Sequence, residues 1–191
     1  MLFQQGELST RYITEDDVQT LSNWLSNPEV LRFYEGRDKP QSVEQVGERY
    51  ISSSEGKEKK CIVEYKDRAI GYVQMYPLDA EWKALYGYGK KKNVWGMDQF
   101  IGETAYWNRG IGTELVQAAI TYISNELGAV TIAMDPRVSN ERAIRCYEKC
   151  GFQKVKVLKE HELHEGVLED CWMMEYKKKG EFADETSTCS N

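Results

Sequence analysis

The chain has 191 residues, of which 41% are hydrophobic and 29% are charged, and its formal net charge at pH 7 is −6. This size and composition predict one soluble globular domain, large enough to bury a core of its own. The negative charge argues against a nucleic-acid partner, because the phosphates of a nucleic acid would be repelled.

The N-terminal half of the chain predicts a strand, two helices and a β-hairpin, in that order. Thr14 and Ser42 are each followed three residues later by a side chain that can complete a capping box, so each should begin a helix. Two β-prone runs joined by a short charged turn predict the hairpin. The expected segments are a strand at 8–13, helices at 14–27 and 42–52, a charged surface loop at 53–60, strands at 61–65 and 69–76, and a long loop at 77–93.

The C-terminal half alternates between strand and helix patterns, which predicts an α/β domain with a mixed sheet over residues 1–176. Apolar residues at helical spacing follow the strand Val94–Ile101 as far as Gly128. The remaining expected segments are a strand at 130–134, a helix at 140–150, closing strands at 152–160 and 168–176 around an acidic turn at 160–170, and a polar, frayed tail at 177–191.

The stretch 94–113 carries the clearest signs of chemistry. Asp98 lies inside the apolar, β-prone run, where a carboxylate is unusual. Gly110 and Gly112 then form a turn before a helix, and such a turn leaves backbone N–H groups that can bind a phosphate. Neither a P-loop nor the third glycine of a dinucleotide fingerprint is present. These residues predict a carboxylate base beside a phosphate site, although a plain tight turn remains the alternative.

A second motif begins at Asn140, where the sequence reads NERAIRCYEKCGF. Together with the Gly110/Gly112 turn, this motif resembles the GNAT superfamily of acyl-CoA N-acyltransferases. The resemblance implies the GNAT fold, an α/β fold with a central mixed, mostly antiparallel sheet flanked by about four helices. It also implies that acetyl-CoA is the cofactor, with its pyrophosphate at the first motif and its pantetheine arm along the second.

Four further stretches narrow the resemblance to one branch: GMDQFIGE at 96–103, Asp135-Pro136, RAIR at 142–145 and HELHEG at 161–166. They are similar to the aminoglycoside 6'-N-acetyltransferases, most of all to the acetyltransferase half of bifunctional acetyltransferase–phosphotransferase resistance enzymes. The implied reaction is acetyl transfer to the 6'-amino group of a cationic aminoglycoside. One departure is Trp107, which replaces the Gln or Arg that usually opens the pyrophosphate motif.

The resemblance also assigns roles to single residues. Asp98 is expected to accept the proton of the amine, with anchoring of the cationic amine as the alternative. Tyr147 is expected to protonate the leaving thiolate, or else only to pack against the cofactor. The expected cofactor-binding residues are Gln99, Phe100, Ile101, Arg109, Gly110, Ile111, Gly112, Thr113, Asn140, Ala143 and Tyr147, and the expected substrate-binding residues are Tyr72, Gln74, Asp98, Asp135, Glu162 and Asp170.

The five cysteines, at positions 61, 146, 150, 171 and 189, are an odd and scattered set, which favours reduced thiols in the cytoplasm. Cys146 and Cys150 have no second pair, and His161 and His164 do not form HExxH, so we expect no metal. No apolar run has the length of a membrane span and no secretory signal is evident, so we expect no membrane partner. The sequence leaves monomer or homodimer open.

Two other functions remain open from the sequence alone. The chain could acetylate another small amine or a protein N-terminus, or it could be a catalytically silent acyl-CoA-binding module. GMDQFIGE and HELHEG argue against the first alternative, and retention of both Asp98 and Tyr147 argues against the second.

Overall fold

The computed structural model describes residues 1–52 and 57–178 of the chain. Within these ranges it contains one eight-stranded sheet with the order β1-β2-β3-β4-β5-β6-β8-β7, in which only β5 and β6 are parallel neighbours. The predicted α/β domain with a mixed, mostly antiparallel sheet is therefore confirmed. The strands are β1 (Phe3–Gln5), β2 (Leu8–Tyr12), β3 (Lys59–Tyr65), β4 (Arg68–Pro77), β5 (Val94–Ile101), β6 (Thr131–Met134), β7 (Gln153–His164) and β8 (Val167–Lys177).

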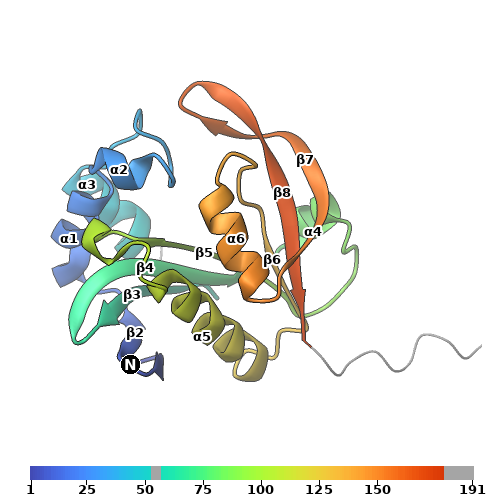
Figure 1. Cartoon of the computed structure of the whole chain (residues 1–191), viewed down its shortest axis with the longest axis horizontal. Coiled ribbons are helices and arrows are strands. Elements are labelled where there is room, and N and C mark those ends of the chain that lie inside the picture. The colour runs from blue at the N-terminus through green and yellow to red at the C-terminus, as the bar shows by residue number, and fades with distance from the viewer. Residues whose placement is uncertain (53–56, 179–191) are drawn as a thin grey trace, which may run out of the picture.

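Helices cover both faces of the sheet (Figure 1). The two longest helices, α5 and α6, pack on one face, whereas α1 to α3 and α4 cover two parts of the other face. The described residues contain α1 (Val18–Trp24), α2 (Pro28–Leu31), α3 (Val43–Val46), α4 (Ala80–Tyr86), α5 (Ile111–Asn125) and α6 (Glu141–Lys149), a π-helical segment (Gly47–Ser52) after α3, and short 3-10 turns at Glu15–Asp17 and Thr104–Tyr106.

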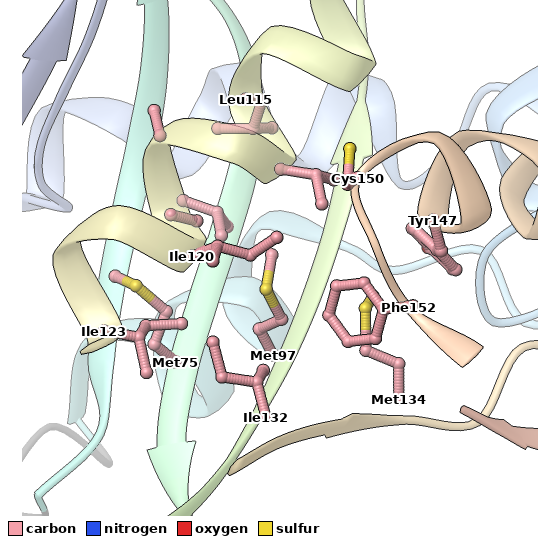
Figure 2. Close-up of a cluster of buried hydrophobic side chains, with 14 of the residues drawn as sticks. Met75, Met97, Leu115, Ile120, Ile123, Ile132, Met134, Tyr147, Cys150 and Phe152 are labelled. Carbon is pink, nitrogen blue, oxygen red and sulfur yellow. The ribbon is translucent and has the colours of Figure 1, made fainter. Parts of the chain in front are cut away.

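Alternate side chains of β5 join the hydrophobic cores on opposite faces of the sheet. Met97 joins the core beneath α5 and α6 (Figure 2), whereas Phe100 joins the core beneath α1 to α3. Because successive residues of a strand point to opposite faces, Asp98 lies on the Phe100 side and Gln99 on the Met97 side. Two adjacent polar residues therefore reach different elements of the fold.

The parallel pair β5 and β6 is hydrogen bonded over a short length only. Residues 94–96 of β5 pair with residues 131–133 of β6, while β5 stays paired with β4 as far as Ile101. Beyond Gly96, the edge of β5 that faces β6 has no strand partner in the described part of the chain. A stretch of backbone in the middle of the sheet is consequently left open on one side.

The segment 77–93, predicted to be a loop, contains the helix α4. Asp79 caps this helix by accepting the Trp82 N–H at 2.9 Å, and Gly87 ends it with a φ of 86°. Tyr86 is buried with residues of β5, β6, β7 and β8. The loop prediction was wrong because the aromatic and charged residues of this segment give no clear helical periodicity. The capping residues Asp79 and Gly87 can nevertheless be recognised in the sequence.

The predicted acidic turn at 160–170 was also wrong. β7 continues to His164 and β8 begins at Val167, so Glu165 and Gly166 alone form the turn, both with positive φ values of 50° and 81°. The acidic residues on either side belong to β7, which is the edge strand of the sheet, and to its neighbour β8. Residues 53–56 of the predicted surface loop and 179–191 of the predicted tail lie outside the described residues.

Candidate functional site

Two cavities share Asp98, Phe33 and Tyr34 in their walls. The large cavity, of about 540 Å³, extends from β5 to the first turns of α5 and α6. The small cavity, of about 300 Å³, is lined by the segment after α2, the π-helical segment and the end of β7. Both volumes fall in the range of small-molecule sites. A group bound in one cavity can therefore approach a group bound in the other at Asp98.

Two residues of β4 hold Asp98 in place. Gln74, its direct cross-strand neighbour, donates its Nε2–H to Asp98 Oδ2 at 2.7 Å. Tyr72 donates its hydroxyl to Gln74 Oε1 at 3.0 Å, which fixes the orientation of the amide. Tyr72 itself is fully buried and lines neither cavity, so its predicted role in substrate binding is indirect at most.

The pKa of Asp98 is raised to about 6, chiefly because burial disfavours the ionised carboxylate. The hydrogen bond from Gln74 opposes this rise, and the charge of Asp135 adds to it. A carboxylate with this pKa is mostly ionised at pH 7 and is more basic than an ordinary aspartate, whose pKa is ~3.9. These properties suit a group that accepts a proton near neutral pH.

Replacing Gln74 with leucine tests whether this residue orients the base or binds substrate. The hydrogen bond lowers the pKa of Asp98, so its loss should raise that pKa. Because a base is active when deprotonated, the acid limb of the pH profile of kcat/KM should move upward, by about one pH unit. Tyr72→Phe should produce a smaller shift in the same direction. A higher KM for the amine with an unmoved acid limb would instead identify Gln74 as a substrate ligand.

Tyr147 of α6 lies in the wall of the large cavity and is hydrogen bonded to Gln99. The Gln99 Nε2–H donates to the Tyr147 Oη at 2.7 Å, so the tyrosine hydrogen remains available to a third group. Burial raises the pKa of Tyr147 well above its usual value, and the hydroxyl therefore stays protonated at neutral pH. Its ring packs against Phe152 in the core (Figure 2). The residue is placed both to pack and to donate a proton.

The turn before α5 opens onto the large cavity. Gly110 is the N-cap, with a φ of 82°, and Gly112 lies in the first turn, where an added Cβ would meet no atom within 4 Å. The Thr113 N–H already donates to Gly110 O at 3.0 Å, which leaves the N–H groups of Ile111 and Gly112 for a ligand. The first turn of this 15-residue helix thus fits a phosphate group.

The open edge of β5 also faces the large cavity. The Gly102 N–H donates to Ile70 O of β4. Because alternate residues of an antiparallel strand face the same neighbour, Phe100 also directs its backbone polar groups toward β4, whereas Gln99 and Ile101 direct theirs toward the open edge. The predicted backbone role therefore suits Gln99 and Ile101, and Phe100 can contribute only its side chain.

Two side chains determine which polar groups along the open edge of β5 remain free to bind a ligand. Trp107 donates its Nε1–H to Ile101 O at 2.8 Å, so that carbonyl is already occupied. The Gln99 Oε1 is buried and has no hydrogen-bond partner among the described residues. An unpaired buried acceptor is costly unless a ligand donates to it. The cavity therefore fits a ligand with a phosphate at one end and an amide-bearing arm along β5, as coenzyme A has.

The acids predicted to hold the substrate already have partners within the protein. Asp135 lies 2.9 Å from His161 Nε2, and this contact raises the pKa of the histidine. Glu162 pairs with the buried Arg137 at 3.2 Å. Asp135 lines the large cavity and Glu162 the small one, and because each pairs with its partner through one carboxylate oxygen, each can still accept from a cationic substrate.

Three other predicted residues lie outside both cavities. Asp170 pairs with Lys159 at 2.6 Å, Arg109 is exposed and stacks on Tyr106, and the side chain of Ile111 is buried in the core. The remaining predicted residues do line a cavity. Those of the large cavity are Asp98, Gln99, Phe100, Ile101, Gly110, Gly112, Thr113, Asp135, Asn140, Ala143 and Tyr147, and those of the small cavity are Gln74, Asp98 and Glu162.

Asn140 has a local role that the sequence left open. Its side-chain oxygen accepts the Ala143 N–H at 3.3 Å, which caps α6. Sequence reasoning missed Arg137 and His161, which pair with Glu162 and Asp135. It named Gln99 but not the contact of its side chain with Tyr147. Strand alternation predicts that Gln99 points away from Asp98, but no local pattern predicts the other two contacts.

Cys61, Cys146, Cys150 and Cys171 are free thiols. Within residues 1–52 and 57–178, no group of three or more histidine, cysteine, aspartate or glutamate side chains is arranged to hold a metal ion. None of the helices in these ranges is both long enough and apolar enough to span a bilayer.

Comparison with known proteins identifies a family. Residues 14–159 match the model of an acetyltransferase (GNAT) domain. An aminoglycoside N(6')-acetyltransferase type 1 from Klebsiella pneumoniae is 30% identical over 149 residues, which cover 77% of this chain and 74% of the relative.

Solved structures with the same architecture include two acetyltransferases. The structure of AAC(6')-Ib in complex with ribostamycin and coenzyme A has a TM-score of 0.76 and 26% identity, and the alignment covers 91% of this chain and 94% of that chain. A spermidine N-acetyltransferase from Vibrio cholerae in complex with CoA and spermine also has a TM-score of 0.76, with 20% identity over 91% of this chain and 96% of that chain. At this lower identity the second likeness concerns the fold alone.

Proposed function

Since this chain belongs to the GNAT acetyltransferase family and uses acetyl-CoA as its acetyl donor, we propose that it acetylates the 6'-amino group of an aminoglycoside. The relative at 30% identity, named as an aminoglycoside N(6')-acetyltransferase, supports this choice of acceptor. The other support comes from the site itself, whose two cavities are lined by four acids that a cationic acceptor can meet: Glu35, Asp98, Asp135 and Glu162.

The observation that carries the proposal is the position of Asp98 in the walls of both cavities. Acetyl-CoA bound in the large cavity supplies an activated thioester. An amine that enters from the small cavity then meets Asp98 before it meets the thioester. The amine must be neutral to attack, and a carboxylate with a pKa of about 6 can hold the ammonium form and accept its proton.

Tyr147 and the backbone of β5 act on the thioester, whose sulfur is the leaving group. The Gln99 side chain holds the Tyr147 oxygen, so the hydroxyl hydrogen is directed away from Gln99 and can be donated to the leaving sulfur. Backbone N–H groups of Gln99 and Ile101 can donate to the carbonyl oxygen on which negative charge develops. Both contributions come from groups that are fixed in the fold before the ligand binds.

A thiol-release assay with acetyl-CoA tests the proposal. Kanamycin and tobramycin are compared with spermidine and with a peptide that has a free N-terminus, all at equal concentration. The proposed function requires the aminoglycosides to give the highest kcat/KM, with the product acetylated at the 6'-amine by NMR. Preferential turnover of spermidine or peptide would overturn the aminoglycoside assignment, and CoA binding without turnover of any amine would indicate a silent module.

A further inference from the structure

Arg142, in the first turn of α6, lies against two aromatic rings. Its guanidinium carbon lies 4.3 Å from the centroid of the Phe33 ring and 4.2 Å from that of Trp107. The two rings are themselves edge to face, with centroids 5.8 Å apart. The guanidinium therefore lies in the corner formed by the two rings, which come from segments far apart in the sequence.

The edge of this guanidinium has no acidic partner. Within the described residues, Arg142 makes no salt bridge or hydrogen bond, although Arg11, Arg37, Arg49, Arg137 and Arg145 each pair with a carboxylate. Burial lowers the pKa of Arg142, which shows that its charge is poorly compensated by the protein. A partly buried, unpaired cation costs free energy unless an anion binds to it.

The residues around Arg142 indicate which kind of anion would bind to it. Arg142, Trp107, Gly110 and Gly112 all line the large cavity, and Trp107 lies three residues before the N-cap of α5. The guanidinium of Arg142 and the N–H groups at the start of α5, which both favour an oxyanion, therefore line one cavity.

We propose that Arg142, held against the rings of Phe33 and Trp107, binds a pyrophosphate oxygen of acetyl-CoA in the cavity that also contains the backbone N–H groups of the first turn of α5. This inference rests on the cofactor named above and is independent of the acceptor. The N–H donors of this guanidinium make no hydrogen bond within the described residues, and a planar fork held in advance loses little entropy when it binds an oxyanion. Trp107 thus has two roles, since its indole N–H also fixes Ile101 O.

Calorimetry with Arg142→Met tests the proposal. The variant keeps an unbranched side chain against the rings but loses the charge. The dissociation constants of CoA and of 3'-dephospho-CoA, which retains the pyrophosphate, should both rise by about 10- to 100-fold, because a hydrogen bond to a charged group is lost. Pantetheine, titrated at millimolar concentration, should bind wild type and variant equally. Arg142→Lys should fall between the two, because a point charge cannot stack in the same way.

The controls distinguish binding of a phosphate by Arg142 from a purely structural role of this residue. Arg68→Met, the same substitution on the exposed β3–β4 hairpin, should leave all three affinities unchanged. An equal loss for pantetheine would show that Arg142 only shapes the cavity, and an unchanged affinity for 3'-dephospho-CoA would move the contact to the 3'-phosphate. Either result overturns the proposal. Failure of wild type to bind CoA would instead overturn the proposed function.

Discussion

The Asp98→Asn variant is expected to have a kcat about 10²- to 10⁴-fold below that of wild type at pH 7, with little change in CoA affinity. Asparagine preserves the size of the side chain and can still receive the Gln74 hydrogen bond, but it cannot accept a proton. With the pKa of Asp98 at about 6, wild-type kcat/KM should be lost as the pH falls through this value. The variant should lack this acid limb.

The recovery of the variant at high pH provides the matching test. Free amine accumulates as the pH rises toward the pKa of an aliphatic ammonium group, ~10.4 for lysine, so kcat of Asp98→Asn should increase steadily above pH 8. Asp135→Asn removes the same charge without removing the base, and it should mainly raise KM for the acceptor. An unchanged kcat with a raised KM for Asp98→Asn would contradict the base role and leave amine anchoring.

The Gly112→Val variant is expected to bind CoA about 100-fold more weakly and the aminoglycoside unchanged. An added Cβ at Gly112 meets no protein atom within 4 Å, so the fold should accept the side chain. The methyl groups would instead enter the large cavity and prevent a phosphate from reaching the backbone N–H groups of the α5 turn. Loss of one or two hydrogen bonds to a charged group accounts for a factor of this size.

Gly47→Val is a matched control for this experiment. Gly47 also lies in a helical segment, an added Cβ there also meets no atom within 4 Å, and it lines neither cavity. Both variants are compared by calorimetry with CoA and by thermal unfolding. If a folded Gly112→Val protein binds CoA as tightly as Gly47→Val, the phosphate is bound elsewhere.

Much of the fold could be predicted from the sequence because its signals are local. The capping boxes of Thr14 and Ser42 form as expected, and the apolar spacing after Gly110 corresponds to α5. The helix α4 was missed and the two strands β7 and β8 were predicted too short, for a common reason. Their charged and aromatic residues face solvent or a neighbouring element, so neither helical nor strand periodicity is visible in the sequence.

The site was less predictable because its contacts join distant segments. Sequence motifs indicate Asp98 and Tyr147, and the structure places both in the wall of the large cavity. The side chains that orient them depend on strand register and helix packing: Gln74 is 24 residues from Asp98, and Gln99 is 48 residues from Tyr147. Pairing of Glu162 with Arg137 likewise requires β7 to lie beside the segment after β6, which no local pattern specifies.

The short pairing of β5 with β6 has a consequence for how the domain holds together. Among the described residues, three residue pairs join β5 to β6, so strands β1 to β5 and strands β6 to β8 have few hydrogen bonds in common. A cofactor that binds along the open edge of β5 and also contacts α6 would therefore connect the two halves of the sheet. At a hundredfold excess over its dissociation constant, such a ligand stabilises the native state by about 2.7 kcal/mol. Without cofactor, strands β1 to β5 should therefore separate from strands β6 to β8 first, whereas the cofactor-bound protein should unfold as one unit.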